Sequence, residues 1–198
     1  TDSALDTKGL VPRASIKVPV TFYEVGKSAQ RLYLSQFARE SLIEFTVLRL
    51  SNVYGGKASE TRERSFLDRC IRLGIQGKTI ECFAGGAYRR DYLHIDDAVS
   101  AFLTAMSAPT LTRNVTFDIG TGISTPIKET LTVLQSKLKE CLGRDVELVE
   151  VRPAHQVEAV DLEDRFVDSR AFQESTGWKA SIALASGIER EVMRSQET

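Results

Sequence analysis

Residues 21–33 read Thr-Phe-Tyr-Glu-Val-Gly-Lys-Ser-Ala-Gln-Arg-Leu-Tyr, and the rest of the chain is organised around this stretch. Apolar residues recur at helical spacing from Phe22 to Arg39, which predicts a helix there. Residues four apart share one face of a helix, so Tyr23 and Lys27 are expected side by side. An ammonium beside a phenol favours the phenolate, which can then accept a proton near neutral pH. The spacing therefore indicates a general acid/base pair.

The composition indicates a soluble globular protein. The 198 residues are 42% hydrophobic and 27% charged, which is ordinary for one substantial core or for a core with a small additional lobe. No apolar run approaches the ~20 residues that a membrane-spanning helix requires. The net charge of -1 provides no general basic field for nucleic acid, so an anionic ligand has to be recognised by a few placed residues. We expect neither a membrane nor a nucleic-acid partner.

The cysteines and the first residues indicate a cytoplasmic protein. The chain has three cysteines, Cys70, Cys82 and Cys141. An odd number without a close-spaced pair argues against a disulfide framework and against a zinc site. Residues 1–8 are polar and do not resemble a secretory signal.

Beyond the first helix, strands and helices alternate, which is typical of the α/β class. We expect strands over residues 44–50, 79–83, 91–95, 114–119 and 145–151, with residues 165–167 as a candidate partner of the last. We expect helices over residues 60–72, 96–107, 126–142, 169–175 and 184–194. Asp96 is the predicted N-cap of the second of these helices, and Thr125 and Pro126 are the predicted N-cap and first position of the third. Asn52 is placed in a loop after the first strand, where functional loops occur.

Four separated segments then form one ordered pattern. They are Tyr23-x-x-x-Lys27, the run Leu-Arg-Leu-Ser-Asn-Val-Tyr-Gly at 48–55, the run Arg-Asp-Tyr-Leu-His-Ile-Asp-Asp-Ala at 90–98, and Asp168-Ser169-Arg170 with Gly177-Trp178. Together they resemble the extended short-chain dehydrogenase/reductases, and among these the NAD-dependent nucleotide-sugar epimerase and dehydratase family. Any one segment could arise by chance, but the ordered set could hardly do so. The resemblance extends from Thr1 to about residue 187.

The resemblance implies the C-terminal half of a Rossmann-like, doubly wound parallel sheet, together with a small α/β substrate-binding lobe. Residues 1–55, and partly 85–119, would belong to the NAD(P)-binding domain, and residues 56–84 and 120–198 mainly to the lobe. Family members open with a glycine-rich loop that binds the cofactor pyrophosphate. The only Gly-x-Gly here, at 120–122, comes too late and lacks the third glycine, so we interpret it as a turn. We therefore expect a longer native protein, and no activity from this chain alone.

In the family, a sugar 4-hydroxyl loses its proton while carbon 4 gives a hydride to the nicotinamide, which yields a 4-keto sugar. By resemblance, Tyr23 is the base and later the acid, and Lys27 favours its phenolate and binds the nicotinamide ribose. Both residues would therefore contact the cofactor, NAD or NADP. Thr1 is the candidate for the Ser or Thr that hydrogen-bonds the reacting hydroxyl, with an ordinary surface threonine as the alternative.

The resemblance also implies three substrate-binding residues. Asn52 would contact the sugar diphosphate, with a turn asparagine as the alternative. Arg90 and Arg152 would bind phosphate, because guanidinium groups match phosphate oxygens in geometry. The motif that begins at Arg152 has Ala154-His155 where the family has Gly-Asp.

Several reactions stay open. Sugar 4,6-dehydratases carry Thr-Asp-Glu where this chain has Thr1-Asp2-Ser3, and a serine is a poor base, so epimerisation is favoured over dehydration. A 4-keto reductase is a further alternative. A non-catalytic binding or scaffold protein is the rival from another class. The missing glycine loop supports it, as do Gly26 and Arg31, where the family more often has Ser and Glu.

Other conspicuous residues have simpler explanations. A strand followed by a helix cap accounts for His94, Asp96 and Asp97, so we expect no metal site. Trp178 is expected to pack in the C-terminal lobe. A solvated helix face would account for four basic residues, Arg62, Arg64, Arg69 and Arg72.

The resemblance further implies a homodimer. Family members commonly pair through the helix that carries the tyrosine and the lysine. An apolar stripe on that helix could supply the contact, although a stripe that faces the core looks the same in sequence. Its members are Leu32, Leu34, Phe37 and Ala38.

Overall fold

The computed structural model describes residues 21–56, 65–83, 86–151 and 166–194. The helices are α1 (Phe22–Arg39), α2 (Phe66–Ile75), α3 (Ile95–Ser107), α4 (Pro109–Thr112), α5 (Ile127–Leu142), α6 (Arg170–Thr176) and α7 (Leu184–Arg194). The strands are β1 (Thr46–Leu50), β2 (Asn52–Tyr54), β3 (Ile80–Phe83), β4 (Arg89–Arg90), β5 (Tyr92–His94), β6 (Val115–Ile119), β7 (Thr125–Pro126) and β8 (Leu148–Val151). The predicted α/β class is confirmed.

The strand pairs are mainly parallel. β1 pairs with β6, β2 with β5 and β3 with β8, all in parallel, whereas β4 and β7 are antiparallel. Parallel neighbours need a crossover connection, and helices usually supply it. Only Ser51 separates β1 from β2, so one extended run of chain pairs first with β6 and then with β5.

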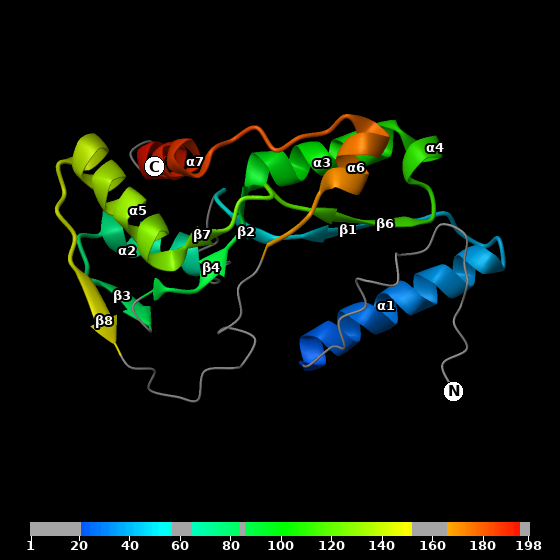
Figure 1. Ribbon diagram of the computed structural model, residues 1–198, viewed down its shortest axis with the longest axis horizontal. Helices are drawn as coiled ribbons and strands as arrows, with labels where there is room; N and C mark the ends of the chain where they lie inside the picture. The colour runs from blue at the N-terminus through cyan, green and yellow to red at the C-terminus, as the bar shows by residue number, and fades with distance from the viewer. Residues whose placement is uncertain (1–20, 57–64, 84–85, 152–165, 195–198) are drawn as a thin grey trace.

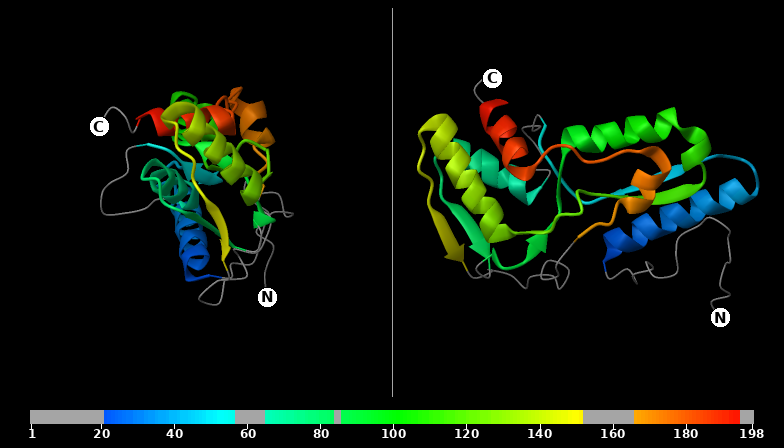
Figure 2. Two further views of the ribbon diagram at one scale, coloured as in Figure 1. Left: turned by 90° about the vertical axis from the view of Figure 1, so that its left-hand side faces the viewer. Right: turned by 45° about the horizontal axis from the view of Figure 1, so that its top comes forward.

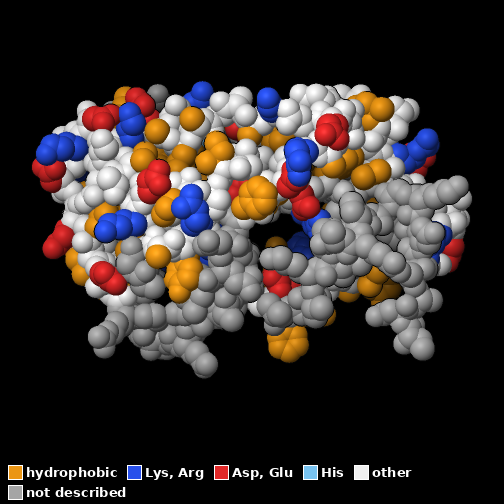
Figure 3. Space-filling view, viewed as in Figure 1, with side chains coloured by type: hydrophobic (Ala, Val, Ile, Leu, Met, Phe, Trp, Pro, Cys, Tyr) orange, Lys and Arg blue, Asp and Glu red, His pale blue; other side chains and the backbone are white. Residues whose placement is uncertain are grey.

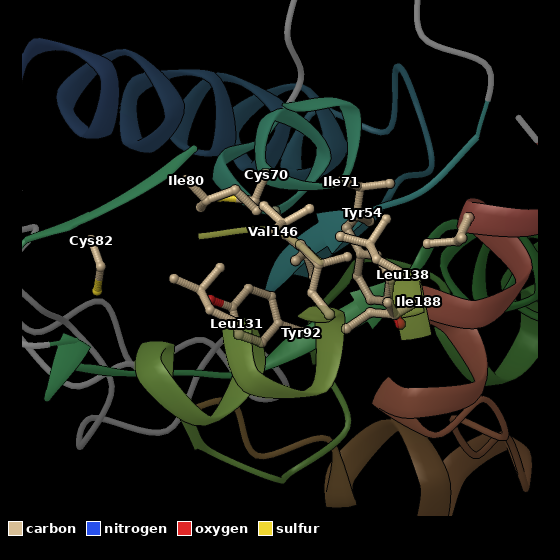
Figure 4. Close-up of a cluster of buried hydrophobic side chains, with 13 residues drawn as sticks. Tyr54, Cys70, Ile71, Ile80, Cys82, Tyr92, Leu131, Leu138, Val146 and Ile188 are labelled. Atoms are coloured by element: carbon tan, nitrogen blue, oxygen red, sulfur yellow. The ribbon is translucent and has the colours of Figure 1, made fainter. Parts of the chain in front are cut away.

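Two apolar clusters form the interior. One lies between α2, α5, α7 and the strands beside them, and Figure 4 shows Tyr54, Leu138 and Ile188 within it. The other joins β5, β6, α3 and α6, and consists of Leu93, Ala98, Ala101, Ala105, Phe117, Ile119, Phe172 and Trp178. Figure 1 shows the elements around the two clusters as neighbouring parts of an elongated molecule. The run β1–β2 extends from one part into the other.

Helix α1 begins and ends at the predicted residues. Its start is fixed by a capping box, in which Thr21 Oγ1 accepts the Glu24 N–H at 3.2 Å and Glu24 Oε2 accepts the Thr21 N–H at 3.3 Å. In Figures 1 and 2, α1 lies on one side of β1 and β6, and α3 and α6 lie on the other. Helices therefore lie on both sides of the β1–β6 pair, as expected of a doubly wound fold.

The predicted cap at Asp96 is wrong, because the N-cap lies two residues earlier and α3 begins at Ile95. His94 is the N-cap: its ψ of 144° is extended, and its Nδ1 accepts the Asp96 N–H at 3.2 Å. The strand predicted over 91–95 accordingly spans only Tyr92–His94. A histidine ring nitrogen takes here the part that a capping side-chain oxygen usually plays.

The predicted start of α5 is also wrong. Thr125 and Pro126 form β7 and pair with Arg90 and Arg89, and Pro126 has an extended ψ of 141°. The helix therefore begins at Ile127. It ends at Leu142 as predicted, because Gly143 adopts a left-handed φ of +62°.

Three further predictions were wrong in part. Residues 166–167 form no strand, and β8 pairs with β3 instead. Helix α2 begins at Phe66 after its N-cap Ser65, and Arg62 and Arg64 lie outside the described residues. Trp178 packs not in the α2/α5/α7 part but on Phe172, with ring centroids 5.6 Å apart, and donates from Nε1 to Ser100 Oγ at 2.8 Å.

The surface mixes both signs of charge with apolar side chains, as Figure 3 shows for one face. No helix among the described residues is both long and apolar enough to cross a membrane.

Candidate functional site

Tyr23 and Lys27 lie in the first two turns of α1 and face each other, as their spacing predicts. The Lys27 Nζ lies 5.8 Å from the centroid of the Tyr23 ring, within the range of a cation–π contact. The same Nζ lies 3.5 Å from Gln30 Oε1. The Tyr23 side chain is 74% exposed. The pair therefore presents a phenol hydroxyl and an ammonium on an open part of the helix.

The first turn of α1 lies at the end of the sheet where ligands bind in α/β folds. A short connection, residues 40–45, joins α1 to β1, so the helix runs antiparallel to that strand (Figures 1 and 2). Its N-terminus consequently lies on the side where β1 and β6 end. Open parallel sheets bind ligands beyond the carboxyl ends of their strands. Tyr23 and Lys27 are thus on the expected side of the fold.

Asn52 lies where the chain changes its strand partner. The Ser51 N–H donates to the Ile119 carbonyl of β6 at 2.8 Å, and the next N–H, of Asn52, donates to the Asp91 carbonyl at 3.0 Å. Asn52 therefore begins β2 and is not in a loop, which corrects the prediction. Its side-chain Nδ2 also donates to the Asp91 carbonyl at 3.3 Å. The chain therefore exchanges β6 for β5 as its strand partner between Ser51 and Asn52.

Asp91 links the point where β1 passes into β2 to the turn that follows β6. Its carboxylate is fully buried and accepts the Thr121 N–H at 3.0 Å, the Thr121 hydroxyl at 2.7 Å and the Gly122 N–H at 3.0 Å. A Cβ at Gly120 would overlap the Asp91 carboxylate. The interpretation of Gly-x-Gly as a turn is confirmed. The N–H groups of residues 121 and 122 already donate to the Asp91 carboxylate. Sequence reasoning missed Asp91, although a carboxylate just before a buried strand is itself a signal.

The arginines beside Asp91 belong to the β4–β7 pair. Arg90 is buried, and its Nη1 donates to the Arg89 carbonyl at 2.9 Å. Arg89 is exposed and donates to the Ser124 carbonyl. Two other predicted site residues, Thr1 and Arg152, lie outside the described residues. The structure thus places Asn52 beside the residue that follows Arg90, since the Asp91 carbonyl accepts from the Asn52 side chain.

The side chains of His94 and Asp97 hydrogen-bond to other protein groups and are not arranged as ligands of a metal ion. The Asp97 carboxylate accepts the N–H groups of Ser181 and Ile182 and the Ser181 hydroxyl, at 2.9–3.1 Å. The His94 Nε2 lies 3.1 Å from Glu191 Oε1. Within the described ranges, histidine, cysteine and carboxylate side chains form no group suited to a metal ion.

A pocket of about 410 Å³ lies beside the 120–122 turn. Its lining includes Arg170 and Trp178. The Arg170 guanidinium holds the pKa of Asp168 at about 2 by hydrogen bonding to that exposed carboxylate. The Trp178 Nε1 is bonded to Ser100. The strongest polar groups around this pocket are therefore already paired with protein atoms.

Comparisons with known proteins agree with this fold. Residues 8–120 match the sequence model of the NAD dependent epimerase/dehydratase family. A UDP-glucose 4-epimerase of Mycolicibacterium smegmatis is 27% identical over 174 residues, which are 88% of this chain and 52% of that protein. The crystal structure of UDP-glucose 4-epimerase with UDP-glucose from Thermotoga maritima superposes with a TM-score of 0.81 at 30% identity, covering 94% of this chain and 57% of that one.

A third similarity shows the fold alone. UDP-glucuronic acid 4-epimerase from Bacillus cereus, in complex with UDP-glucuronic acid and NAD, gives a TM-score of 0.76 at 19% identity, over 96% of this chain and 57% of that one. The predicted Rossmann-like α/β fold is confirmed. The chain spans about half the length of the curated relatives that it matches.

Proposed function

The chain belongs to the NAD-dependent epimerase/dehydratase family, and from this premise we propose that it carries the acid/base half of a nucleotide-sugar epimerase. The reaction would invert a sugar carbon through a 4-keto intermediate. The observation that carries the proposal is the Tyr23–Lys27 pair, with its ammonium 5.8 Å from the tyrosine ring centroid at the N-terminus of α1. Tyr23 supplies the proton acceptor, and Lys27 supplies a positive charge near it.

The proton steps follow from these two side chains. The Tyr23 oxygen accepts the proton of the sugar 4-hydroxyl and returns it once the keto group is reduced again. Lys27 holds a positive charge beside the phenolate during the interval between the two transfers. The cofactor, when bound, would supply reversible hydride transfer at carbon 4, and Tyr23 and Lys27 would provide the accompanying proton transfers. Turning the keto sugar between the two hydride transfers makes the product an epimer of the substrate.

The residues present fit one end of NAD or NADP. An exposed phenol and ammonium suit the nicotinamide and its ribose, which Lys27 would hydrogen-bond. The pyrophosphate has no place on the 120–122 turn, because Asp91 accepts the N–H groups of Thr121 and Gly122. The 120–122 turn is therefore not the binding site of the pyrophosphate, and we propose that this chain alone is inactive.

Asn52 and Arg90 are the proposed substrate contacts within the described residues. Both flank Asp91 at the switch point, where β1 leaves β6 and β2 joins β5. A guanidinium and an amide there suit the oxygens of a nucleoside diphosphate. Thr1, on the reacting hydroxyl, and Arg152, on phosphate, complete the proposed site from outside the described residues.

We propose a division into a cofactor domain, residues 1–55 and partly 85–119, and a substrate lobe, mainly 56–84 and 120–198. Most members of the two apolar clusters follow it, whereas Tyr54 and Tyr92 in the first cluster and Phe172 and Trp178 in the second lie across it. We also propose a cytoplasmic homodimer that pairs through α1. Leu32 and Phe37 of the predicted stripe are exposed, whereas Leu34 and Ala38 are half-buried. Only the first two would therefore contribute fully to such an interface.

The experiment is a matched pair of tyrosine variants in the full-length protein. UDP-, dTDP-, CDP- and GDP-hexoses are incubated with NAD or NADP, and the sugars are separated afterwards. Tyr23→Phe should lower turnover by about 10²–10⁴-fold, the usual effect of losing a general acid/base. Tyr33→Phe, on the exposed face of the same helix, should leave it unchanged.

The products separate the alternatives. A 4,6-dehydratase would accumulate a 4-keto-6-deoxy sugar, and a 4-keto reductase would oxidise NADPH only when given a keto sugar. Full turnover in Tyr23→Phe would refute the assignment. A wild-type protein without turnover on the whole panel would favour the non-catalytic alternative.

A further inference from the structure

The chain leaves β2 through two glycines whose N–H groups are both held by carboxylates. Gly55 and Gly56 have φ values of +94° and +92°, which other residues rarely adopt. The Gly55 N–H donates to Asp68 Oδ1 on α2 at 2.8 Å, and the Gly56 N–H donates to Glu191 Oε2 on α7 at 3.0 Å. Two helices distant in sequence therefore fix the end of this segment.

Glu191 is a buried carboxylate with three donors. Its side chain is 7% exposed. Besides the Gly56 N–H, it binds His94 Nε2 at 3.1 Å and Arg194 Nη1 at 2.8 Å. His94 Nδ1 accepts the Asp96 N–H, so the proton of the neutral ring lies on Nε2 and points to Glu191. Both oxygens of Glu191 are thus used as acceptors.

Helix α7 also packs directly on the strand that carries Asn52. A Cβ at Gly187 would overlap the hydroxyl of Tyr54 and lie 3.1 Å from the His94 ring. The Tyr54 and His94 rings meet edge to face at 5.3 Å, and Figure 4 shows Tyr54 in the same cluster as Ile188 of α7. The missing side chain at 187 lets α7 approach β2 closely.

We propose that Glu191 is a positioning residue, which fixes residues 52–56 through Gly56 and His94 and thereby sets the affinity for the nucleotide sugar. The segment is held at one end by Asp91, which binds the Asn52 backbone and amide, and at the other by Glu191. This inference rests on the proposed function, because it takes Asn52 as a substrate contact. A segment fixed before binding loses less conformational entropy when the substrate arrives.

Glu191→Gln tests the role with little change of shape. The Gly56 N–H and His94 Nε2 reach different oxygens of the carboxylate, so the glutamine NH₂ group would replace one of these acceptors and face a donor. Glu189→Gln is the matched control, because Glu189 lies on the same helix, is 49% exposed and pairs with Lys137. Glu191→Asp is the second variant, since it keeps both acceptor oxygens on a shorter side chain.

The measurements are backbone hydrogen exchange at Gly56 and kinetics of the full-length protein on the sugar nucleotide that it turns over. For Glu191→Gln we expect Gly56 to exchange ~10-fold faster and KM to rise ~10-fold, the effect of losing about 1.4 kcal/mol of positioning. The kcat should stay within about two-fold, because Tyr23 and Lys27 are untouched. Glu191→Asp should show smaller changes of the same kind, and Glu189→Gln none.

The outcomes separate the two levels of the proposal. Unchanged exchange at Gly56 in both Glu191 variants would overturn the inference. Faster exchange with an unchanged KM would reduce Glu191 to a structural residue and overturn its positioning role. If the wild type turns over no sugar nucleotide, the proposed function fails, and with it the link to affinity, while the exchange data still decide whether Glu191 fixes the segment.

Discussion

The proposed acid/base pair lies on helix α1, and Glu191, its proposed support, lies on helix α7. The two helices differ in how far they are buried. Of the 18 residues of α1, none is buried, and the helix is fixed locally by its Thr21–Glu24 capping box. α7 has 11 residues, of which Gly187, Ile188, Glu191 and Val192 are buried. A helix that offers a reactive phenol has to leave it accessible, whereas a helix that fixes a distant segment has to be buried against it. The difference shows which properties each helix takes from its own sequence and which from its neighbours.

The largest expected contrast is between apolar truncations on the two helices. Ile188→Ala should lower the free energy of unfolding by about 3–4 kcal/mol, because the residue is fully buried in the first cluster. Leu32→Ala, where the side chain is 60% exposed, should change it by less than about 0.5 kcal/mol. Urea unfolding at low protein concentration measures both. A loss above about 1 kcal/mol for Leu32→Ala would show that another surface covers α1.

The next largest effect on stability is expected at Gly187, the glycine on α7. Gly187→Ala should cost about 2–3 kcal/mol, because the new Cβ overlaps the Tyr54 hydroxyl and has to displace α7 or the ring. Thermal or urea unfolding gives the value, and faster hydrogen exchange in residues 52–56 should accompany it. A Gly187→Ala protein as stable as the wild type would mean that α7 does not dock closely on β2.

The Glu191 carboxylate on α7 makes the free energy of unfolding depend on pH. Burial by itself raises the pKa of Glu191, but the hydrogen bond from His94, the charge of Arg194 and the Gly56 N–H together lower it below its usual range. A lowered folded-state pKa gives stability that is present above the ordinary value of ~4.3 and is lost as pH falls through the folded pKa. Glu191→Gln should therefore cost about 1–2 kcal/mol at pH 7 and progressively less below pH ~4. Urea unfolding at several pH values checks this, and a constant difference down to pH ~3 would contradict it.

The smallest effect is expected on α1. Gly26 lies within the helix, and a Cβ added there would meet nothing within 4 Å. Gly26→Ala should raise the free energy of unfolding by about 0.5–1 kcal/mol, because alanine restricts the unfolded chain and favours helix. The opposite signs of Gly26→Ala and Gly187→Ala, measured side by side, sharpen the comparison. If Gly26→Ala lowered the free energy of unfolding, the helical turn of α1 that contains Gly26 would have to pack against another surface.

Sequence reasoning predicted the helices whose structure depends on neighbouring residues in the chain. It failed at segments that become strands only because a distant strand pairs with them. The bounds of α1 and α7 and the shared face of Tyr23 and Lys27 follow from periodicity and helix geometry, and they were predicted correctly. Thr125-Pro126 looked like a helix start and became β7, because Arg89 and Arg90 offer it an antiparallel partner. Asn52 looked like a turn residue and became the start of β2, because β5 takes over from β6 at that point.

The family and the proximity of Tyr23 and Lys27 were determined by the sequence itself, since ordered motifs and an i, i+4 spacing need only the chain and the geometry of a helix. The roles of Asp91 and Glu191 were decided only by the tertiary structure. The donors that they hold are far away in sequence: the amides of Thr121 and Gly122 for Asp91, and Gly56 and His94 for Glu191. A buried carboxylate is stable only where such donors converge on it, and the spacing of residues along a chain does not reveal that convergence.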